Sequence, residues 1–199
     1  MDREGWFSVT PERVAEHIAD RMVRKKDTVI VDAFAGVGGN SIQMALRGAF
    51  VIAIDLDPVK LKCAAHNAHV YGVQDRISFV CIDFFHFVRS VATESAQLTG
   101  VCTQHPFDAV FLSPPWGGPS YLLLDEFDLK NDLRPDGFKI FEAAQSLSPN
   151  IAYFLPRNTV ISQIISLAGS GRSCEIEQNT LNKKLKAITA YYGDLIAQS

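Results

Sequence analysis

The chain has 199 residues, of which 47% are hydrophobic and 21% are charged, and its formal net charge is −3. These values are ordinary for one globular domain with a sizeable core, and they argue against a protein that grips a long nucleic-acid tract through many phosphates. No apolar run approaches the roughly 18 residues of a membrane-spanning helix, so no membrane partner is expected, and scattered cysteines without a C-x-x-C pair argue against a zinc site or a disulfide framework.

Hydrophobic pattern and turn residues predict an alternation of strands and helices along the chain. The predicted strands are residues 28–33, 50–54, 77–82, 109–112, 151–155, 174–180 and 185–192. The predicted helices are residues 40–47, 57–71, 137–146 and 158–168. This alternation implies an α/β fold with a mostly parallel sheet and helices on both faces, and the last two strands are expected to close the seven-stranded sheet as an antiparallel pair.

Candidate ligand-binding residues follow four of the predicted strands. Asp32 begins a glycine-rich segment that runs to Asn40, Asp55 and Asp83 follow the next two strands, and Ser113 follows the fourth. Ligands of open α/β sheets bind at the carboxyl ends of the strands, near the point where the strand order reverses. We therefore expect these residues to form one composite pocket.

The segment 32–40 favours a methyl donor over a dinucleotide. Its spacing differs from G-x-G-x-x-G, and an acidic residue at its start would repel a pyrophosphate but suits the ammonium of a methionyl group. Asp55 is placed to accept both ribose hydroxyl hydrogens, and Asp83 to accept from the adenine amine, with a turn residue as the alternative for Asp83. These features predict S-adenosylmethionine as the cofactor and a Rossmann-like class I methyltransferase fold.

The residues expected to bind this donor are Thr10, Asp32, Phe34, Gly36, Gly38, Asn40, Asp55 and Asp83. Phe7 and Thr10 have core packing as an equal alternative. Asp57 is expected to be only the cap of the following helix. His66 and His69 have no carboxylate or cysteine partner at a metal-ligand spacing, so no metal ion is expected.

The motif Ser113-Pro114-Pro115-Trp116 predicts a clamp for a flat ring that carries an exocyclic amine. Two prolines fix the backbone and supply no N–H donors, so a hydroxyl, free carbonyls and an indole are held at the end of a strand. The amine can donate to Ser113 Oγ and the Pro114 carbonyl while the ring lies on Trp116. These three residues are the catalytic candidates for an amino-group methyltransferase without a strong general base, and an apolar packing corner is the alternative for Trp116.

Five segments of the chain resemble the trimethylguanosine synthase family, and together they cover nearly its whole length. They are residues 5–12, 32–40, 113–119, 154–158 and 188–194. Serine and tryptophan in the S-P-P-W motif separate it from commoner amino-methyltransferases, which carry Asn or Asp with an aromatic residue such as Tyr. The resemblance implies that two methyl groups pass to the guanine N2 of a 7-methylguanosine RNA cap, with S-adenosylhomocysteine as the second product.

The same resemblance implies how the substrate is held. Trp116 is expected to stack on the positively charged 7-methylguanine through a cation–π contact. Tyr121 and Arg157 match phosphate-contacting positions of the family, and either Lys184 or Lys186 is expected to join them, while a surface ion pair is the alternative for Arg157. The implied partners are 7-methylguanosine-capped small nuclear and nucleolar RNAs and ribonucleoprotein proteins. The implied location is the nucleus (nucleolus or Cajal body), with the cytoplasm as a second location.

We expect a single domain over residues 1–199, with its core in residues 28–199 and residues 1–27 bordering the pocket. Residues 91–107 are longer than the corresponding family loop and polar enough for a loop insertion. Family members carry upstream residues that help to cover the pocket, so a chain that starts at the opening motif is expected to be a catalytic core or to have an open pocket. Two other functions stay open: methylation of an internal RNA guanine or of adenine in DNA, and cap binding without catalysis.

Overall fold

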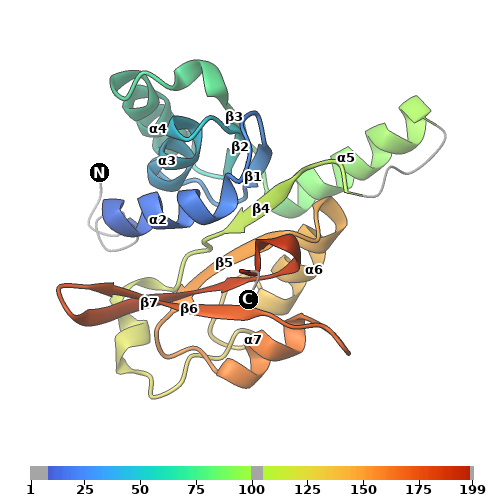
Figure 1. Ribbon diagram of the computed structural model, residues 1–199. Coiled ribbons are helices and arrows are strands. Elements are labelled where there is room, and N and C mark those ends of the chain that lie inside the picture. The colour runs from blue at the N-terminus through green and yellow to red at the C-terminus, as the bar shows by residue number, and fades with distance from the viewer. Residues whose placement is uncertain (1–8, 100–104, 198–199) are drawn as a thin grey trace.

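The computed structural model describes residues 9–99 and 105–197, which form one seven-stranded sheet with helices on both faces (Figure 1). The expectations for residues 1–8, Phe7 among them, lie outside the described residues. Within the described ranges, no helix combines the length and the apolar character needed to cross a membrane.

The sheet has the strand order β3-β2-β1-β4-β5-β7-β6. Its strands are β1 (Val29–Asp32), β2 (Phe50–Asp55), β3 (Ile77–Cys81), β4 (Ala109–Leu112), β5 (Ile151–Pro156), β6 (Glu175–Leu181) and β7 (Lys184–Tyr191). The first five strands run parallel, whereas β7 runs antiparallel to both β5 and β6, so the predicted sheet and its antiparallel closing pair are confirmed. The order reverses between β1 and β4, which is where a ligand site is expected.

Among the described residues, three helices cover each face of the sheet. One group is α2 (Glu12–Met22), α3 (Gly39–Leu46) and α4 (Pro58–Val70), and the other is α5 (Phe84–Thr99), α6 (Gly137–Leu147) and α7 (Ile161–Leu167). Short 3-10 helices lie at η1 (Gln74–Arg76), η2 (Gly118–Leu123) and η3 (Gly193–Leu195). Ile30 and Phe111 pack under the first group, and their neighbours Val31 and Val110 pack under the second, because side chains alternate along a strand.

Helices α2 and α5 are absent from the prediction made from the sequence. Because α5 continues to Thr99, the expected loop insertion over residues 91–107 is wrong for its first half. Residues 84–99 contain neither glycine nor proline, and their polar side chains fit the outer side of an amphipathic helix as well as they fit a loop.

Arg21 connects α2 to strands β6 and β7 through hydrogen bonds and a cation–π contact. Its Nη1 donates to Glu175 Oε1 at 2.9 Å and to Glu177 Oε2 at 2.8 Å, and its guanidinium carbon lies 4.2 Å from the ring centroid of Tyr191. The hydrogen bond from Arg21 lowers the pKa of the Glu175 carboxyl. Arg21 lies in the last turn of α2, so this network holds that end of the helix against β6 and β7.

Candidate active site

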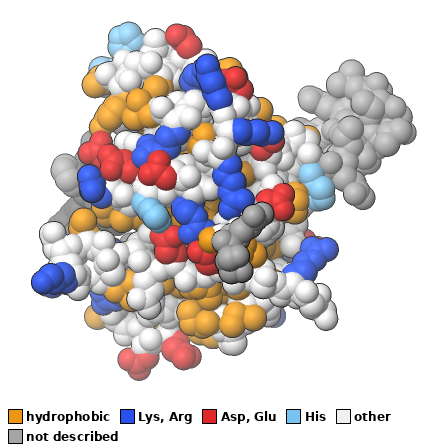
Figure 2. Space-filling model, in the orientation of Figure 1, with side chains coloured by type: hydrophobic (Ala, Val, Ile, Leu, Met, Phe, Trp, Pro, Cys, Tyr) orange, Lys and Arg blue, Asp and Glu red, His pale blue; other side chains and the backbone are white. Residues whose placement is uncertain are grey.

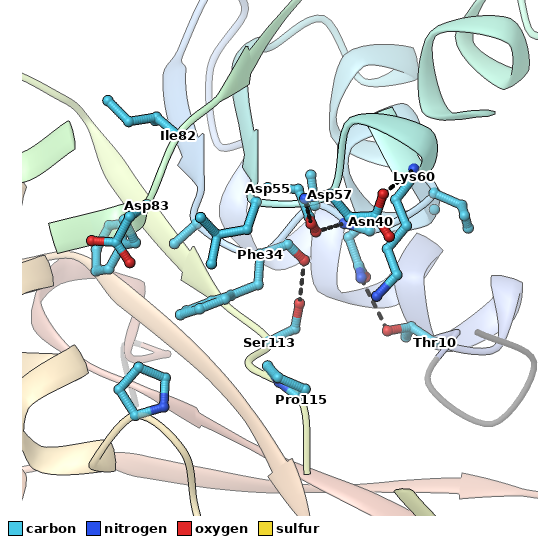
Figure 3. A pocket seen from close by; sticks show the side chains of 18 of the residues that line it. Thr10, Phe34, Asn40, Asp55, Asp57, Lys60, Ile82, Asp83, Ser113 and Pro115 are labelled. Atoms are coloured by element: carbon cyan, nitrogen blue, oxygen red, sulfur yellow. Dashed lines mark hydrogen bonds between the residues drawn. The ribbon is translucent and has the colours of Figure 1, made fainter. Parts of the chain in front are cut away.

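Two cavities lie side by side at the carboxyl ends of the strands and share Ser113 and Pro115. The larger cavity, of about 340 Å³, is formed by the segments that follow β1, β2 and β3 (Figure 3). The smaller cavity, of about 80 Å³, is lined by Pro114, Trp116 and Phe154 among others. Molecules bound in the two cavities would therefore meet at Ser113.

Asp55, at the end of β2, connects the loops that build the larger cavity. Its Oδ2 accepts a hydrogen bond from the N–H of Gly36 at 2.8 Å, and its Oδ1 accepts one from the N–H of Asp57 at 2.9 Å. Asp57 caps α4 by accepting from the N–H groups of Val59 and Lys60, as predicted. A carboxylate has about four acceptor sites, so Asp55 keeps capacity for two ligand hydroxyls.

Asp83 lies at the other end of the larger cavity in Figure 3. Its Oδ1 accepts from the N–H of His86 at 3.0 Å, so it caps the first turn of α5 and also lines the cavity. Ile82, Phe84 and Phe85 line the cavity beside it, and such apolar walls suit a flat ring. Within the described part of the chain, no three His, Cys, Asp or Glu side chains gather in a group that could hold a metal ion.

Asp32 is only 1% exposed and does not line the larger cavity, in contrast to Asp55 and Asp83. Ser41 Oγ donates to its Oδ2 at 2.6 Å, and its Oδ1 has no hydrogen-bond partner among the described residues. Burial raises the pKa of Asp32 to about 6. Hydrogen bonds from Ser41 and from the Phe34 N–H lower this pKa, but their effect is smaller than that of burial. The structure therefore places this carboxylate behind the cavity wall.

We expect Asp32 to make the protein less stable as pH rises from about 4 to about 6. In this window the folded protein holds the Asp32 proton more tightly than the unfolded chain, whose pKa is near 3.8, so the free energy of unfolding falls by about 3 kcal/mol. The cost is complete above pH 6 and absent below pH 3.8. Glu175, whose pKa is lowered, contributes a slope of the opposite sign, so the measurement is a difference: in urea unfolding, the wild type should lose about 3 kcal/mol relative to Asp32→Asn as pH rises from about 4 to about 6.

Asp75→Asn is the matched control for this prediction, because Asp75 is exposed and lies outside both cavities. The control should keep the wild-type slope. Between about pH 4 and about pH 6, the change in the free energy of unfolding of Asp32→Asn should differ from that of the wild type. A difference of less than about 1 kcal/mol would contradict the assignment.

The two glycines predicted at the donor have different surroundings. Gly36 lines the larger cavity at φ +54°, with nothing within 4 Å of an added Cβ. Gly38 has φ +86°, and a Cβ there would lie 3.0 Å from Ala64 Cβ, so it lets the start of α3 approach α4 and does not line the cavity. Gly39 lines the cavity and was not predicted.

The remaining predicted donor residues, Thr10, Phe34 and Asn40, line the larger cavity. Asn40 Nδ2 donates to Thr10 Oγ1 at 3.0 Å, and both side chains are buried. The cavity also has two cationic lining residues that were not predicted, Lys60 and Arg134. A lysine in the first turn of a helix looks like an ordinary exposed position in the sequence, so no signal there marks Lys60.

The S-P-P-W motif forms the wall between the cavities. Ser113 Oγ donates to the Phe34 carbonyl at 3.3 Å, which leaves the lone pairs of its oxygen free to accept. Trp116 is half-buried. The centroid of its ring lies 5.2 Å from that of Tyr121, whose ring is nearly perpendicular, and 5.3 Å from that of Phe154, whose ring plane is tilted by 32°. Trp116 thus packs partly against the core and also lines the smaller cavity, so core packing alone does not describe it.

Asn158 fixes the segment that carries Tyr121. Its Nδ2 donates to the carbonyl oxygens of Tyr121 at 3.2 Å and Leu124 at 2.8 Å, which holds η2 beside Trp116. Burial raises the pKa of the Tyr121 hydroxyl, and the charge of Arg157 opposes this rise. Tyr121 lines the smaller cavity, and Asn158, which holds its segment, had no predicted role of its own.

Arg157, Lys184 and Lys186 are exposed and lie outside both cavities. Arg157 Nη1 donates to the Leu185 carbonyl at 3.4 Å, so β7 lies beside it. Within the described ranges none of the three cations has an acidic partner within 4.0 Å, and the ion-pair alternative for Arg157 is not supported. Acidic and basic side chains are interspersed on the face shown in Figure 2, without a continuous basic stripe.

Comparison with known proteins matches the chain to one family model, and two trimethylguanosine synthases are among its relatives. A family model described as RNA cap guanine-N2 methyltransferase matches residues 27–195. Trimethylguanosine synthase of Schizosaccharomyces pombe is 37% identical over 197 residues, which cover 96% of this chain and 77% of that protein. Trimethylguanosine synthase of Saccharomyces cerevisiae is 34% identical over 201 residues, which cover 98% of this chain and 61% of that protein.

Solved structures with a similar fold include several methyltransferases. A SAM-dependent methyltransferase from Agrobacterium tumefaciens aligns with a TM-score of 0.64 at 14% identity, covering 93% of this chain and 63% of that one. An RNA methyltransferase from Salinibacter ruber in complex with S-adenosylhomocysteine aligns with a TM-score of 0.53 at 19% identity, covering 96% of this chain and 97% of that one. At these identities the likeness establishes the Rossmann-like class I fold.

Proposed function

This chain belongs to the RNA cap guanine-N2 methyltransferase family, and from that membership we infer that it converts the 7-methylguanosine cap of small nuclear and nucleolar RNAs to 2,2,7-trimethylguanosine. The enzyme class, a methyltransferase that acts on the guanine N2 of an RNA cap with S-adenosylmethionine as donor, follows directly from the family. The proposal adds the kind of RNA and the transfer of two methyl groups.

The observation that supports this proposal is the pair of cavities that share Ser113 and Pro115. The residues of the larger cavity fit the methyl donor: Asp55 offers acceptors to ribose hydroxyls, and Asp83 lies beside apolar walls that suit adenine. S-adenosylmethionine supplies an electrophilic methyl group on a sulfonium. Guanine in the smaller cavity, against Trp116, would have its N2 at the shared wall.

We propose that the S-P-P-W motif orients the guanine amine. The Ser113 hydroxyl hydrogen is used by the Phe34 carbonyl, so Ser113 Oγ can accept one hydrogen of the amine and the Pro114 carbonyl can accept the other. This pairing would turn the nitrogen lone pair towards the donor. Positioning of this kind can supply several kcal/mol, and the proton can leave the nitrogen after the methyl group has arrived, so no strong base is needed.

Trp116 is proposed to make the 7-methyl group a requirement. A 7-methylated guanine carries a delocalised positive charge, and stacking on an indole gains about 0.5–2 kcal/mol of cation–π attraction. The cap phosphates would lie outside the smaller cavity, where Tyr121, Arg157 and either Lys184 or Lys186 can reach them. Local cations of this kind suit a cap rather than a long RNA tract, in keeping with the net charge of −3.

The proposed partners are a capped small RNA and the proteins of its ribonucleoprotein, and the proposed location is the nucleus, in the nucleolus or Cajal body. An RNA substrate follows from the family. The names of the two relatives support trimethylguanosine as the product, and the family resemblance supports the small RNAs and the nuclear location.

Mass spectrometry of cap dinucleotides tests this function. The cap analogue m7GpppA, incubated with the protein and S-adenosylmethionine, should gain two methyl groups on guanine, and GpppA should react about 2- to 30-fold more slowly because it lacks the cation–π attraction. A guanine-containing RNA without a cap and a DNA duplex should stay unlabelled. Equal rates for the two caps would contradict the role of Trp116, and cap binding without any methylation would indicate a cap-binding module.

A further inference from the structure

Lys60 is a cation in a cavity whose other charged wall residues are mostly carboxylates. It lies in the first turn of α4, lines the larger cavity, and its side chain runs from α4 towards Thr10 (Figure 3). No acidic side chain of the described residues lies within 4.0 Å of its ammonium. Arg134, the other cationic lining residue, already donates to the Leu133 carbonyl at 2.9 Å.

Thr10 adds a second hydrogen-bond donor at the same end of the cavity. Its Oγ1 accepts from Asn40 Nδ2 at 3.0 Å, so its own hydroxyl hydrogen points elsewhere, and no acceptor for it is found among the described residues. An ammonium and a hydroxyl that both have hydrogens to donate call for an anionic group. Asp55 and Asp83 line the rest of the cavity and suit hydroxyl and amine groups.

We propose that Lys60, together with the Thr10 hydroxyl, binds the carboxylate of the methionyl group of the methyl donor. The inference rests on the proposed function, because it takes S-adenosylmethionine as the ligand of the larger cavity. It also gives the donor a direction: the methionyl end lies at Lys60 and Thr10, and the adenine lies at Asp83, at the opposite end in Figure 3. The cap phosphates are the competing anion, but Lys60 does not line the smaller cavity.

Calorimetry with S-adenosylhomocysteine and its decarboxylated analogue tests the assignment. In Lys60→Met the affinity for S-adenosylhomocysteine should fall by about tenfold to a hundredfold, as expected for the loss of a hydrogen bond to a charged group. The affinity for the decarboxylated analogue should stay within about twofold of the wild type, because that ligand lacks only the group that Lys60 binds. Lys60→Arg should restore most of the lost affinity.

Lys62→Met is the control, because Lys62 lies on the same helix, is exposed and lines neither cavity. It should bind both ligands as the wild type does. Equal losses for both ligands in Lys60→Met, no loss at all, or a loss confined to 7-methyl-GTP would each overturn the proposal. A wild-type protein that binds neither adenosyl ligand would instead overturn the proposed function.

Discussion

Replacing Trp116 with alanine is expected to weaken binding of 7-methyl-GTP by about 10- to 5000-fold while S-adenosylhomocysteine binding stays within about threefold. Stacking of a base on an aromatic side chain contributes about 1–3 kcal/mol, and the cationic ring adds about 0.5–2 kcal/mol. Trp116 lines the smaller cavity and not the larger one, so the loss should be confined to the cap. Calorimetry with each ligand measures both effects on the same preparation.

Trp116→Phe is the matched variant, because it keeps an aromatic face beside Tyr121 and Phe154 with a smaller ring. It should lose no more than about tenfold in cap affinity, and its preference for the 7-methylated cap over the unmethylated one should persist. Trp116→Ala should lose that preference. Loss of both ligands in Trp116→Ala would mean that the indole is structural, and unchanged cap affinity would remove it from the site.

The strands and the edge at which the site lies could be predicted from the sequence because parallel strands leave a clear pattern. Strand β4 has its predicted bounds, Ala109–Leu112, since a short apolar run there ends at two prolines. Asp55 ends β2 and Ser113 follows β4, and the reversal of strand order between β1 and β4 brings them to the same edge. The fold therefore assembles residues that lie 58 positions apart in the chain.

The direction of individual side chains could not be predicted. Strand β1 is buried on both faces, so Ile30, Val31 and Asp32 are all inaccessible and alternation gives no sign of which one faces a ligand. Gly38 lies in a glycine-rich segment of the kind that binds ligands, yet the structure favours glycine there because a Cβ would lie only 3.0 Å from Ala64 Cβ. Lys60 is the opposite case: it lines the cavity but was not predicted, because only the direction of its side chain distinguishes it from an exposed lysine.

Asp55→Ala should have the mirror-image effect of Trp116→Ala: the affinity for S-adenosylhomocysteine falls by about a hundredfold, and 7-methyl-GTP binding changes less than about threefold. Hydrogen bonds to a charged group contribute about 1.5–3 kcal/mol, and the alanine removes the acceptor of both ribose hydroxyls. It also leaves the N–H groups of Gly36 and Asp57 without their acceptors, which should loosen the loops after β1 and β2.

Asp55→Asn and a ligand without ribose hydroxyls separate these two contributions. The asparagine keeps one acceptor oxygen, so its loss should be smaller than that of alanine, and Asp75→Asn, an exposed change outside both cavities, should show none. The 2′,3′-dideoxy analogue of S-adenosylhomocysteine should bind the wild type and Asp55→Ala with similar affinity, since it has no hydroxyls for Asp55 to hold. If Asp55→Ala weakens binding of this analogue as strongly as binding of the parent ligand, Asp55 acts only by fixing the loops.

The two alanine variants together show whether the cavities are separate sites. If one variant lost both the donor and the cap, the two cavities would behave as a single site, whereas opposite losses in Trp116→Ala and Asp55→Ala would assign each cavity its own ligand.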